Sequence, residues 1–250
     1  MVMNKKSISP AGETANVKKR PERAAAPVSK RAEVDAFLAA AKRAADNGGS
    51  GRVMLALDAT MSRQPTWDLA CGIQAEMFKS VASKKALSMQ LVYFRGHGEC
   101  RASRWAKSGD ELAKMMSGIE CRAGHTQIEK VLKHAAKEHG RAKVNALIYI
   151  GDAVEENADD IGHAAGQLGL HNVPIFMFQE GGDPHVEIVY KEVARLSRGG
   201  WFRFDRNSPD VLRQLLSSIA VYATGGIKAL KLRGQKTDRL LIEKMSENSG

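Results

Sequence analysis

The stretch VMLALDATMS, residues 53–62, determines the fold class of this chain of 250 residues. Its first five residues are all apolar, which is typical of a central strand in a parallel sheet that is covered on both faces. Polar residues then alternate at Asp58, Thr60 and Ser62, and alternate side chains of an extended segment point the same way. Turn and helix-start chemistry also favours these residue types. Because ligands of open α/β sheets bind at the carboxyl ends of parallel strands, we expect part of a site here.

Outward from this strand, apolar runs and amphipathic stretches alternate in the manner of an α/β protein. The turn Gly96-His97-Gly98 joins two runs into an antiparallel hairpin, whose second, polar strand suits a sheet edge. The sequence therefore predicts a Rossmann-like, doubly wound sheet of six strands, five parallel and one an antiparallel edge strand, with helices on both faces. The predicted strands are residues 53–57, 88–95, 99–105, 144–150, 173–178 and 201–204, and the predicted helices of this domain are 67–82, 110–117, 128–139, 159–168, 187–196 and 210–222.

Two more oxygen-bearing side chains are predicted near other strand ends. Thr126 stands in a glycine-bearing loop before a predicted helix, and Asp152 directly follows the buried strand 144–150. Each residue also has a structural explanation, since Thr126 and Glu129 fit a Thr-x-x-Glu capping box and Asp is common where a loop begins. Together, hydroxyls and two carboxylates on three strand-end loops predict a hard oxygen site of the kind that Mg²⁺ or Mn²⁺ prefers.

With these residues, the chain over about 52–222 resembles a von Willebrand factor type A (VWA) domain of the bacterial, intracellular type. The metal-ion-dependent adhesion site (MIDAS) of that family has the pattern Asp-x-Ser-x-Ser, then a distant Thr and a distant Asp. The matching residues here are Asp58, Thr60, Ser62, Thr126 and Asp152. Thr60 replaces the usual first Ser and keeps its hydroxyl. Gly151-Asp152-Ala153 replaces the commoner Thr-Asp-Gly, which keeps the carboxylate but changes the loop around it.

The resemblance also implies a function for these residues. In the family pattern Thr60, Ser62 and Thr126 supply ligand oxygens, while Asp58 and Asp152 often act through bound water. The cation, Mg²⁺ or Mn²⁺, keeps a coordination position for an acidic side chain of a partner protein. The resemblance therefore implies a non-enzymatic adaptor or recruitment module that binds protein in a cation-dependent manner.

The net charge of +10 lies mostly outside the predicted domain. Residues 1–52, 53–224 and 225–250 contribute +6, +1 and +3, so the excess does not belong to the predicted core. We expect a disordered basic tail over 1–28, where three prolines and few large apolar side chains cannot offset ordering entropy. A helix and a Gly-rich linker are predicted over 29–51, the VWA-like domain over 52–224, and a basic C-terminal tail with a weak helical pattern over 225–250, either solvated or docking on another chain.

The cellular location is predicted from absences in the sequence. Three cysteines without a Cys-x-x-Cys pair do not suit a disulfide scaffold and are compatible with a reducing compartment. No apolar run reaches the roughly 20 residues of a transmembrane span, and no apolar stretch follows the first lysines as in a secretory signal. We therefore expect a cytoplasmic protein without a membrane partner.

Three alternatives remain open at this point. A haloacid-dehalogenase-like, Mg²⁺-dependent phosphatase would use Asp58 as its nucleophile, but such sites resemble Asp-x-Asp and this chain has Thr60 at the second position. Basic residues of the N-terminal tail suit weak, salt-sensitive contact with nucleic-acid phosphates, although the tail has no aromatic residue for base stacking. A zinc site would need four side chains to converge, namely His97, Cys100, Cys121 and His125.

Overall fold

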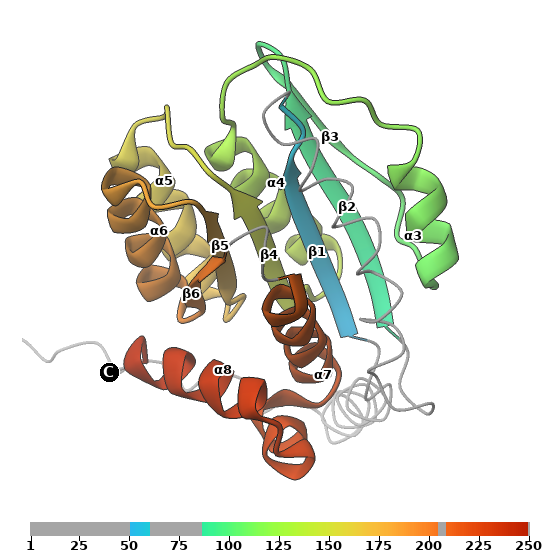
Figure 1. Cartoon of the computed structure of the whole chain (residues 1–250), viewed down its shortest axis with the longest axis vertical. Coiled ribbons are helices and arrows are strands. Elements are labelled where there is room, and N and C mark those ends of the chain that lie inside the picture. Colours follow the sequence, from blue (N-terminus) through green and yellow to red (C-terminus); the bar gives the residue numbers. More distant parts are fainter. Residues whose placement is uncertain (1–50, 61–86, 205–208, 250) are drawn as a thin grey trace, which may run out of the picture. The chain divides into compact units, whose positions relative to one another are not determined.

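A six-stranded sheet forms the centre of the protein, whose computed structural model describes residues 51–60, 87–204 and 209–249. The strand order is β3-β2-β1-β4-β5-β6, and all neighbours pair in parallel except β2 and β3. Figure 1 shows β1 and β4 side by side in the middle of the sheet. The strands are β1 (Gly51–Asp58), β2 (Leu87–Arg95), β3 (Glu99–Ala102), β4 (Ala146–Gly151), β5 (Ile175–Glu180) and β6 (Gly200–Phe204).

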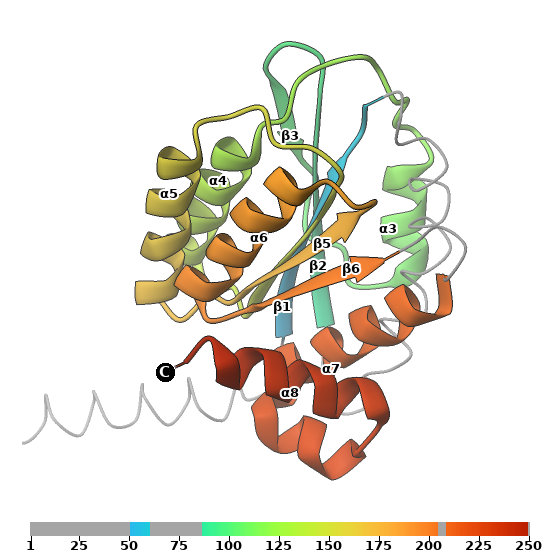
Figure 2. The same cartoon turned by 60° about the vertical axis from the view of Figure 1, so that its left-hand side comes forward.

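Helices cover both faces of this sheet. The helices are α3 (Gly109–Met116), α4 (Ile128–Arg141), α5 (Ala158–Leu170), α6 (Pro184–Ser197), α7 (Pro209–Arg233) and α8 (Lys236–Glu247). One core layer lies under α4, α5 and α6, and the other lies under α3, α7 and α8. Figure 2 shows α4, α5 and α6 together on one side of the strands and α3 on the other. The fold class predicted from the sequence is confirmed.

The strand β1 contributes side chains to both core layers, as its uninterrupted run of apolar residues predicts. Val53, Leu55 and Leu57 belong to the core layer with α7, whereas Met54 and Ala56 belong to the layer with α4. All five side chains are at most 2% exposed. Asp58, two residues after Ala56 at the end of the strand, follows the same alternation as Met54 and Ala56. Its side chain therefore leaves β1 on the face covered by α4.

The predicted elements agree with the observed ones to within a few residues, apart from the last helix. The hairpin partner predicted over 99–105 is shorter as a strand, although a further bridge joins Met89 to Ala106. The chain divides into two units, Met1–Asp46 and Asn47–Gly250, and all described residues belong to the second. The helix predicted over 67–82 and the predicted tail over 1–28 lie outside the described residues.

The C-terminal residues pack on the core and are not a solvated tail. Helix α7 continues to Arg233 through a kink at Gly226, where φ is 64°, and α8 follows. Leu230, Leu241 and Met245 are buried in the same core layer as the first part of α7. The boundary predicted at residue 224 lies two residues before the break in the helix at Gly226. The segment beyond it still packs on the domain, because its basic residues hid an apolar stripe that faces the domain.

Helix α7 is also the one described helix that is long and apolar enough, by length and composition, to cross a membrane. Half of its most apolar window is buried inside the protein. Leu212, Leu215 and Ile219 pack against the sheet, which explains the apolar composition as that of a core helix.

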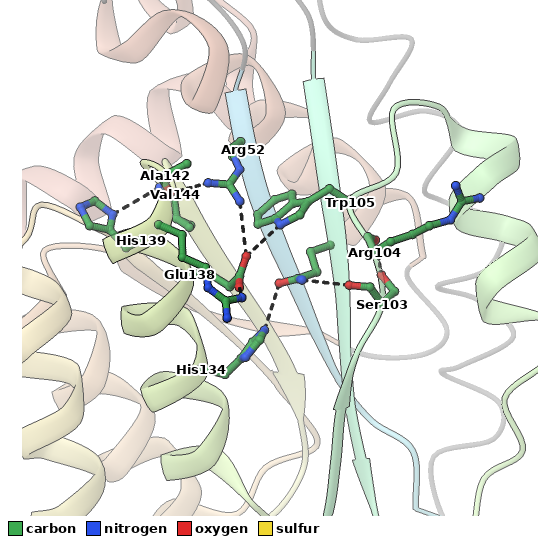
Figure 3. A network of polar contacts seen from close by, with 11 residues as sticks. Arg52, Ser103, Arg104, Trp105, His134, Glu138, His139, Ala142 and Val144 are labelled. Carbon is green, nitrogen blue, oxygen red and sulfur yellow. Dashed lines mark hydrogen bonds and ion pairs between the residues drawn. The ribbon is translucent and has the colours of Figure 1, made fainter.

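A polar network fastens the start of β1 to the end of α4 (Figure 3). The buried carboxylate of Glu138 accepts a hydrogen bond of 3.0 Å from Trp105 Nε1 and pairs with the Arg52 guanidinium at 3.4 Å. The same guanidinium lies 3.8 Å from the centre of the Trp105 ring. Burial favours the neutral form of Glu138, but the bonds from Trp105 and Arg141 prevail and lower its pKa. This network is structural, since it lies at the end of the sheet opposite the carboxyl ends of the strands.

His134 in the same network is expected to make stability depend on pH. Its Nε2 lies 3.1 Å from Gln90 Oε1, and burial lowers its pKa, assisted by Arg141 and Lys137 and opposed by Glu138. The imidazole of His134 is therefore protonated near pH 6.5 in the unfolded chain, and only at a lower pH in the folded protein. Above about pH 6.5 this group does not lower the free energy of unfolding, and below that pH it does. Between pH 7 and pH 5, the free energy of unfolding in urea should fall more steeply for the wild type than for His134→Gln. A His163→Gln variant at an exposed site is the control and should keep the wild-type slope; equal slopes in all three proteins would contradict the prediction.

Candidate metal centre at the strand ends

The candidate centre lies where the strand order reverses. Chain connections run from β1 outward to β2 and β3, then cross to β4 on the other side of β1. In an open α/β sheet the crevice at this switch point, outside the carboxyl ends of the strands, is the usual ligand site. Asp58 is the last residue of β1, and Asp152 follows the last residue of β4. Both carboxylates therefore start from the two strands that border the crevice.

The turn after β1 is fixed by Asp58 itself. One carboxylate oxygen, Oδ1, accepts a hydrogen bond of 2.8 Å from the backbone N–H of Thr60, and Ala59 N–H donates to the carbonyl of Phe94 on β2 at 3.0 Å. Asp58 is only 5% exposed, so its second oxygen has little access to bulk water. The turn thus presents a buried carboxylate and the Thr60 side chain at one place.

Thr126 is held by the loop that follows β4. Its backbone N–H donates to Glu155 Oε2 at 2.8 Å, and its hydroxyl Oγ1 accepts from the backbone N–H of Glu155 at 2.9 Å. The same carboxylate oxygen of Glu155 lies 3.2 Å from His125 Nδ1. Thr126 is 6% exposed. Glu155 was not among the residues predicted from the sequence, since it lies 29 positions from its partner.

The capping box predicted for Thr126 and Glu129 is wrong. Helix α4 begins after Gln127, whose side chain makes no capping bond. The Glu129 carboxylate instead pairs with Lys133 along the helix. Glu156 caps α4 from outside, accepting from the N–H groups of Ile128 and Glu129. The hydroxyl of Thr126 is therefore not engaged in starting the helix.

Gly124 allows the loop before α4 to approach the β2–β3 turn. A Cβ at this position would lie 2.1 Å from the backbone nitrogen of Gly96, closer than atoms can approach. The N–H of His125 donates to the carbonyl of Gly96 at 3.2 Å. This close backbone contact positions the loop that carries Thr126 over the strand ends.

One cleft of about 350 Å³ contains four of the five predicted residues. Its lining consists of Asp58, Thr60, Ala123, Gly124, Thr126, Asp152, Ala153 and Glu155. The fifth predicted residue, Ser62, lies outside the described part of the chain. Positions 58, 60, 126 and 152 come from three segments far apart in the sequence, so their meeting in one cleft is a property of the fold.

The donor atoms of this cleft fit a hard divalent cation. Its polar side chains are two hydroxyls, Thr60 and Thr126, and three carboxylates, Asp58, Asp152 and Glu155. Oxygen donors of this kind suit Mg²⁺ or Mn²⁺, whereas thiolate and imidazole favour zinc or copper. The described lining supplies neither sulfur nor imidazole.

The alternative zinc site does not form in the described part of the chain. The rings of His97 and His125 lie side by side, with 4.8 Å between their centres. Cys121 is buried in the core layer with α3 and α7, however, and Cys100 packs against the opposite layer. Among the described residues, no three His, Cys, Asp or Glu side chains come together closely enough to hold a metal ion by themselves, so a cation in the cleft would depend on the hydroxyls of Thr60 and Thr126 as well. This alternative is excluded for the four residues, because the two thiols lie on opposite faces of the sheet.

The structure explains why Gly151 precedes Asp152. A Cβ at residue 151 would lie 2.7 Å from Tyr190 Oη and 2.8 Å from Tyr149 Cε1. The two tyrosine rings pack edge to face, 5.7 Å apart, beneath the loop. A larger residue here would displace these rings or the loop with Asp152, which accounts for the departure from the commoner Thr-Asp-Gly.

Tyr149 is expected to reduce stability through its hydroxyl. The side chain is fully buried, and its hydroxyl makes no well-formed hydrogen bond within the described structure, although the Tyr190 hydroxyl is close by. Burial, and then the proximity of Tyr190 and Asp58, raises the pKa of Tyr149, so the group stays neutral. A buried unsatisfied polar group costs about 1–3 kcal/mol. Tyr149→Phe should therefore raise the free energy of unfolding by about 1 kcal/mol in urea denaturation, and a decrease of that size would show that the hydroxyl has a partner.

Comparisons with known proteins identify the fold. No protein-family model matches the chain, and no curated protein matches it in sequence. Among solved structures, it is similar to the von Willebrand factor type A protein from Catenulispora acidiphila, with 12% identity and a TM-score of 0.58 over 69% of this chain and 43% of that chain. It is also similar to proximal thread matrix protein 1 from the mussel byssus with a zinc-occupied MIDAS motif, with 14% identity and a TM-score of 0.55 over 69% of this chain and 48% of that one. A third is the SpRpn10 VWA domain, with 12% identity and a TM-score of 0.50 over 70% of this chain and 96% of that domain.

These similarities are at low identity and show the fold alone, which is a VWA fold. The chain spans less than half the length of the first two proteins. One of these neighbours, proximal thread matrix protein 1, holds zinc in its MIDAS motif.

Proposed function

We propose that this VWA module binds an acidic side chain of a partner protein through a divalent cation, Mg²⁺ or Mn²⁺, and is not an enzyme. Asp58, Thr60, Ser62, Thr126 and Asp152 would hold the cation. The observation that carries the proposal is the meeting of four of these residues in one cleft at the switch point of the sheet. When bound, the cation would supply a positive centre able to accept one further carboxylate oxygen.

The residues of the cleft divide this task. The hydroxyls of Thr60 and Thr126 offer neutral oxygens, so they bind a cation without cancelling its charge. Asp58 and Asp152 add negative charge from strand ends that the sheet fixes in place, and Asp58 is oriented by its bond to Thr60 N–H. With Asp58 and Asp152 acting through bound water, as the family pattern implies, the direct ligands would be neutral hydroxyls, and the cation would still attract an anionic partner.

The distribution of charge agrees with recognition of an acidic partner at the cleft alone. Residues 53–224 contribute only +1 of the net +10, so long-range attraction of an acidic partner by the domain is weak. Recognition would then depend on the cleft itself. Weak contact of the basic tails with nucleic-acid phosphates stays a separate prediction, and a cytoplasmic location likewise stays a prediction.

The phosphatase alternative has less support. An enzyme of that class needs a second carboxylate two residues after its nucleophile to transfer protons. Thr60 stands at that position and cannot act as a general acid near neutral pH. Asp152 reaches the cleft from another loop, and we assign it to cation binding.

Capture of partner proteins by the immobilised whole chain tests the proposal. Proteins should be retained from a cell lysate in Mg²⁺, released by EDTA, and missed by Asp58→Ala and Asp152→Ala in Mg²⁺. An exposed carboxylate on α5 provides the control, Asp160→Ala, which should capture the same proteins as the wild type. Equal retention in Mg²⁺, in EDTA and by both site variants would refute cation-dependent recognition.

A further inference from the structure

Two consecutive glutamates of the loop after β4 bind the loop before α4. Glu155 accepts from the N–H of Thr126, and Glu156 accepts from the N–H groups of Ile128 and Glu129. Three backbone donors near the start of α4 are thereby bound by carboxylates that belong to another element. The positive end of the helix dipole at the same place strengthens these contacts.

Glu155 holds Thr126 at two points. Its carboxylate takes the backbone N–H of Thr126, and its own backbone N–H donates to the Thr126 hydroxyl. The second bond occupies one lone pair of Oγ1, so one lone pair and the hydroxyl proton remain for other contacts. The orientation of this hydroxyl is thus set by Glu155 and not by the helix that follows it.

The same contact joins the two loops that border the cleft. Asp152 lies three residues before Glu155 in the loop after β4, and both line the cleft together with Thr126. A displacement of the Asp152 loop would therefore carry the Thr126 hydroxyl with it. In metal sites, groups that orient the ligands are typically worth about 10–100-fold in metal affinity.

We propose that Glu155 is a positioning residue of the strand-end site: its carboxylate holds the Thr126 backbone N–H, which keeps the Thr126 hydroxyl on the Glu155 backbone N–H and set for cation binding, and it does so by hydrogen bonding and not by its charge. This inference rests on the proposed function. Glu156 is assigned a different task, the capping of α4, and so provides a matched control on the neighbouring position.

Calorimetric titration of Mn²⁺ into the whole chain tests this assignment. Glu155→Ala should bind Mn²⁺ about 10-fold more weakly than the wild type. Glu155→Gln keeps an oxygen that can accept from Thr126 N–H, and should stay within about threefold of the wild-type affinity, well inside the 10-fold loss expected for a missing orienting group. Glu156→Ala should lower the melting temperature and leave Mn²⁺ affinity close to that of the wild type.

Amide hydrogen exchange provides a readout that needs no metal. In the metal-free protein, the Thr126 amide should exchange faster in Glu155→Ala than in the wild type or Glu155→Gln. Wild-type Mn²⁺ affinity in Glu155→Ala would overturn the proposal, and so would an equal loss in Glu155→Gln and Glu155→Ala, because charge alone would then explain it. Absence of Mn²⁺ binding by the wild type would instead contradict the proposed function, and this inference with it.

Discussion

Replacing Asp58 by asparagine is expected to lower the affinity of the strand-end site for Mn²⁺ about 100-fold, the upper end of the range for groups that support metal ligands. Asp58 is nearly buried at the end of β1, and its Oδ1 orients the backbone of Thr60. Asparagine keeps an oxygen for the Thr60 N–H but removes the negative charge. The loss should appear in calorimetric titration of the whole chain with Mn²⁺.

The same variant should be no less stable than the wild type in the absence of metal. Three carboxylates line the cleft, those of Asp58, Asp152 and Glu155, and removal of one reduces their mutual repulsion. Asp160→Asn, which removes a carboxylate from an exposed position on α5, is the control and should bind Mn²⁺ like the wild type. Unchanged Mn²⁺ affinity in Asp58→Asn would show that the cation is held elsewhere.

Replacing Arg233 by methionine is expected to cost about 3–5 kcal/mol of the free energy of unfolding, because a buried charge loses its partner. Arg233 Nε donates to Asp238 Oδ2 at 2.9 Å, and its two terminal nitrogens reach Ser217 and Ser218 at 3.0 and 2.8 Å. Asp238 is completely buried. Burial alone would raise the pKa of Asp238, but hydrogen bonds from Arg233, Ser218 and the backbone of Gln235 lower it.

Urea denaturation followed by circular dichroism measures this loss. Arg239→Met removes a charge from the exposed face of α8, the helix that carries Asp238, and should stay within about 0.5 kcal/mol of the wild type. The double variant Arg233→Met with Asp238→Asn should recover part of the loss, since no unpaired charge remains. A loss in Arg233→Met no larger than that of the control would show that this pair does not fasten α8 to α7.

The sequence was sufficient to predict the sheet because the residue patterns that indicate strands and helices are local. The apolar run of β1 and the alternation of apolar runs with amphipathic helices predicted six strands and the antiparallel edge strand, which the structure confirms. The polar residues that follow β1 and β4 were predicted to meet because parallel strands share one carboxyl edge. Asp58, Thr60, Thr126 and Asp152 do line one cleft, although their binding of a cation stays a prediction.

The errors of sequence reasoning concern contacts between distant residues. Thr126 and Glu129 have the spacing of a capping box, but Glu156 takes the helix N–H groups from another loop. The cysteines at 100 and 121 have ligand chemistry, but the sheet separates them. The basic segment 225–250 has the composition of a tail, but Leu230, Leu241 and Met245 are buried in the core layer with residues of the sheet. In each case a local pattern suggested one structure, whereas packing or hydrogen bonding with residues far away in the sequence produced another.

The location of an ion in a crystal tests the central claim most directly. Crystals of the whole chain grown with Mn²⁺, measured at the manganese absorption edge, report where that element is bound. The account predicts one anomalous peak in the cleft formed by Asp58, Thr60, Thr126 and Asp152, and no peak there for Asp58→Asn. A wild-type crystal saturated with Mn²⁺ that shows no peak in this cleft, or shows its peak at another site, would contradict it.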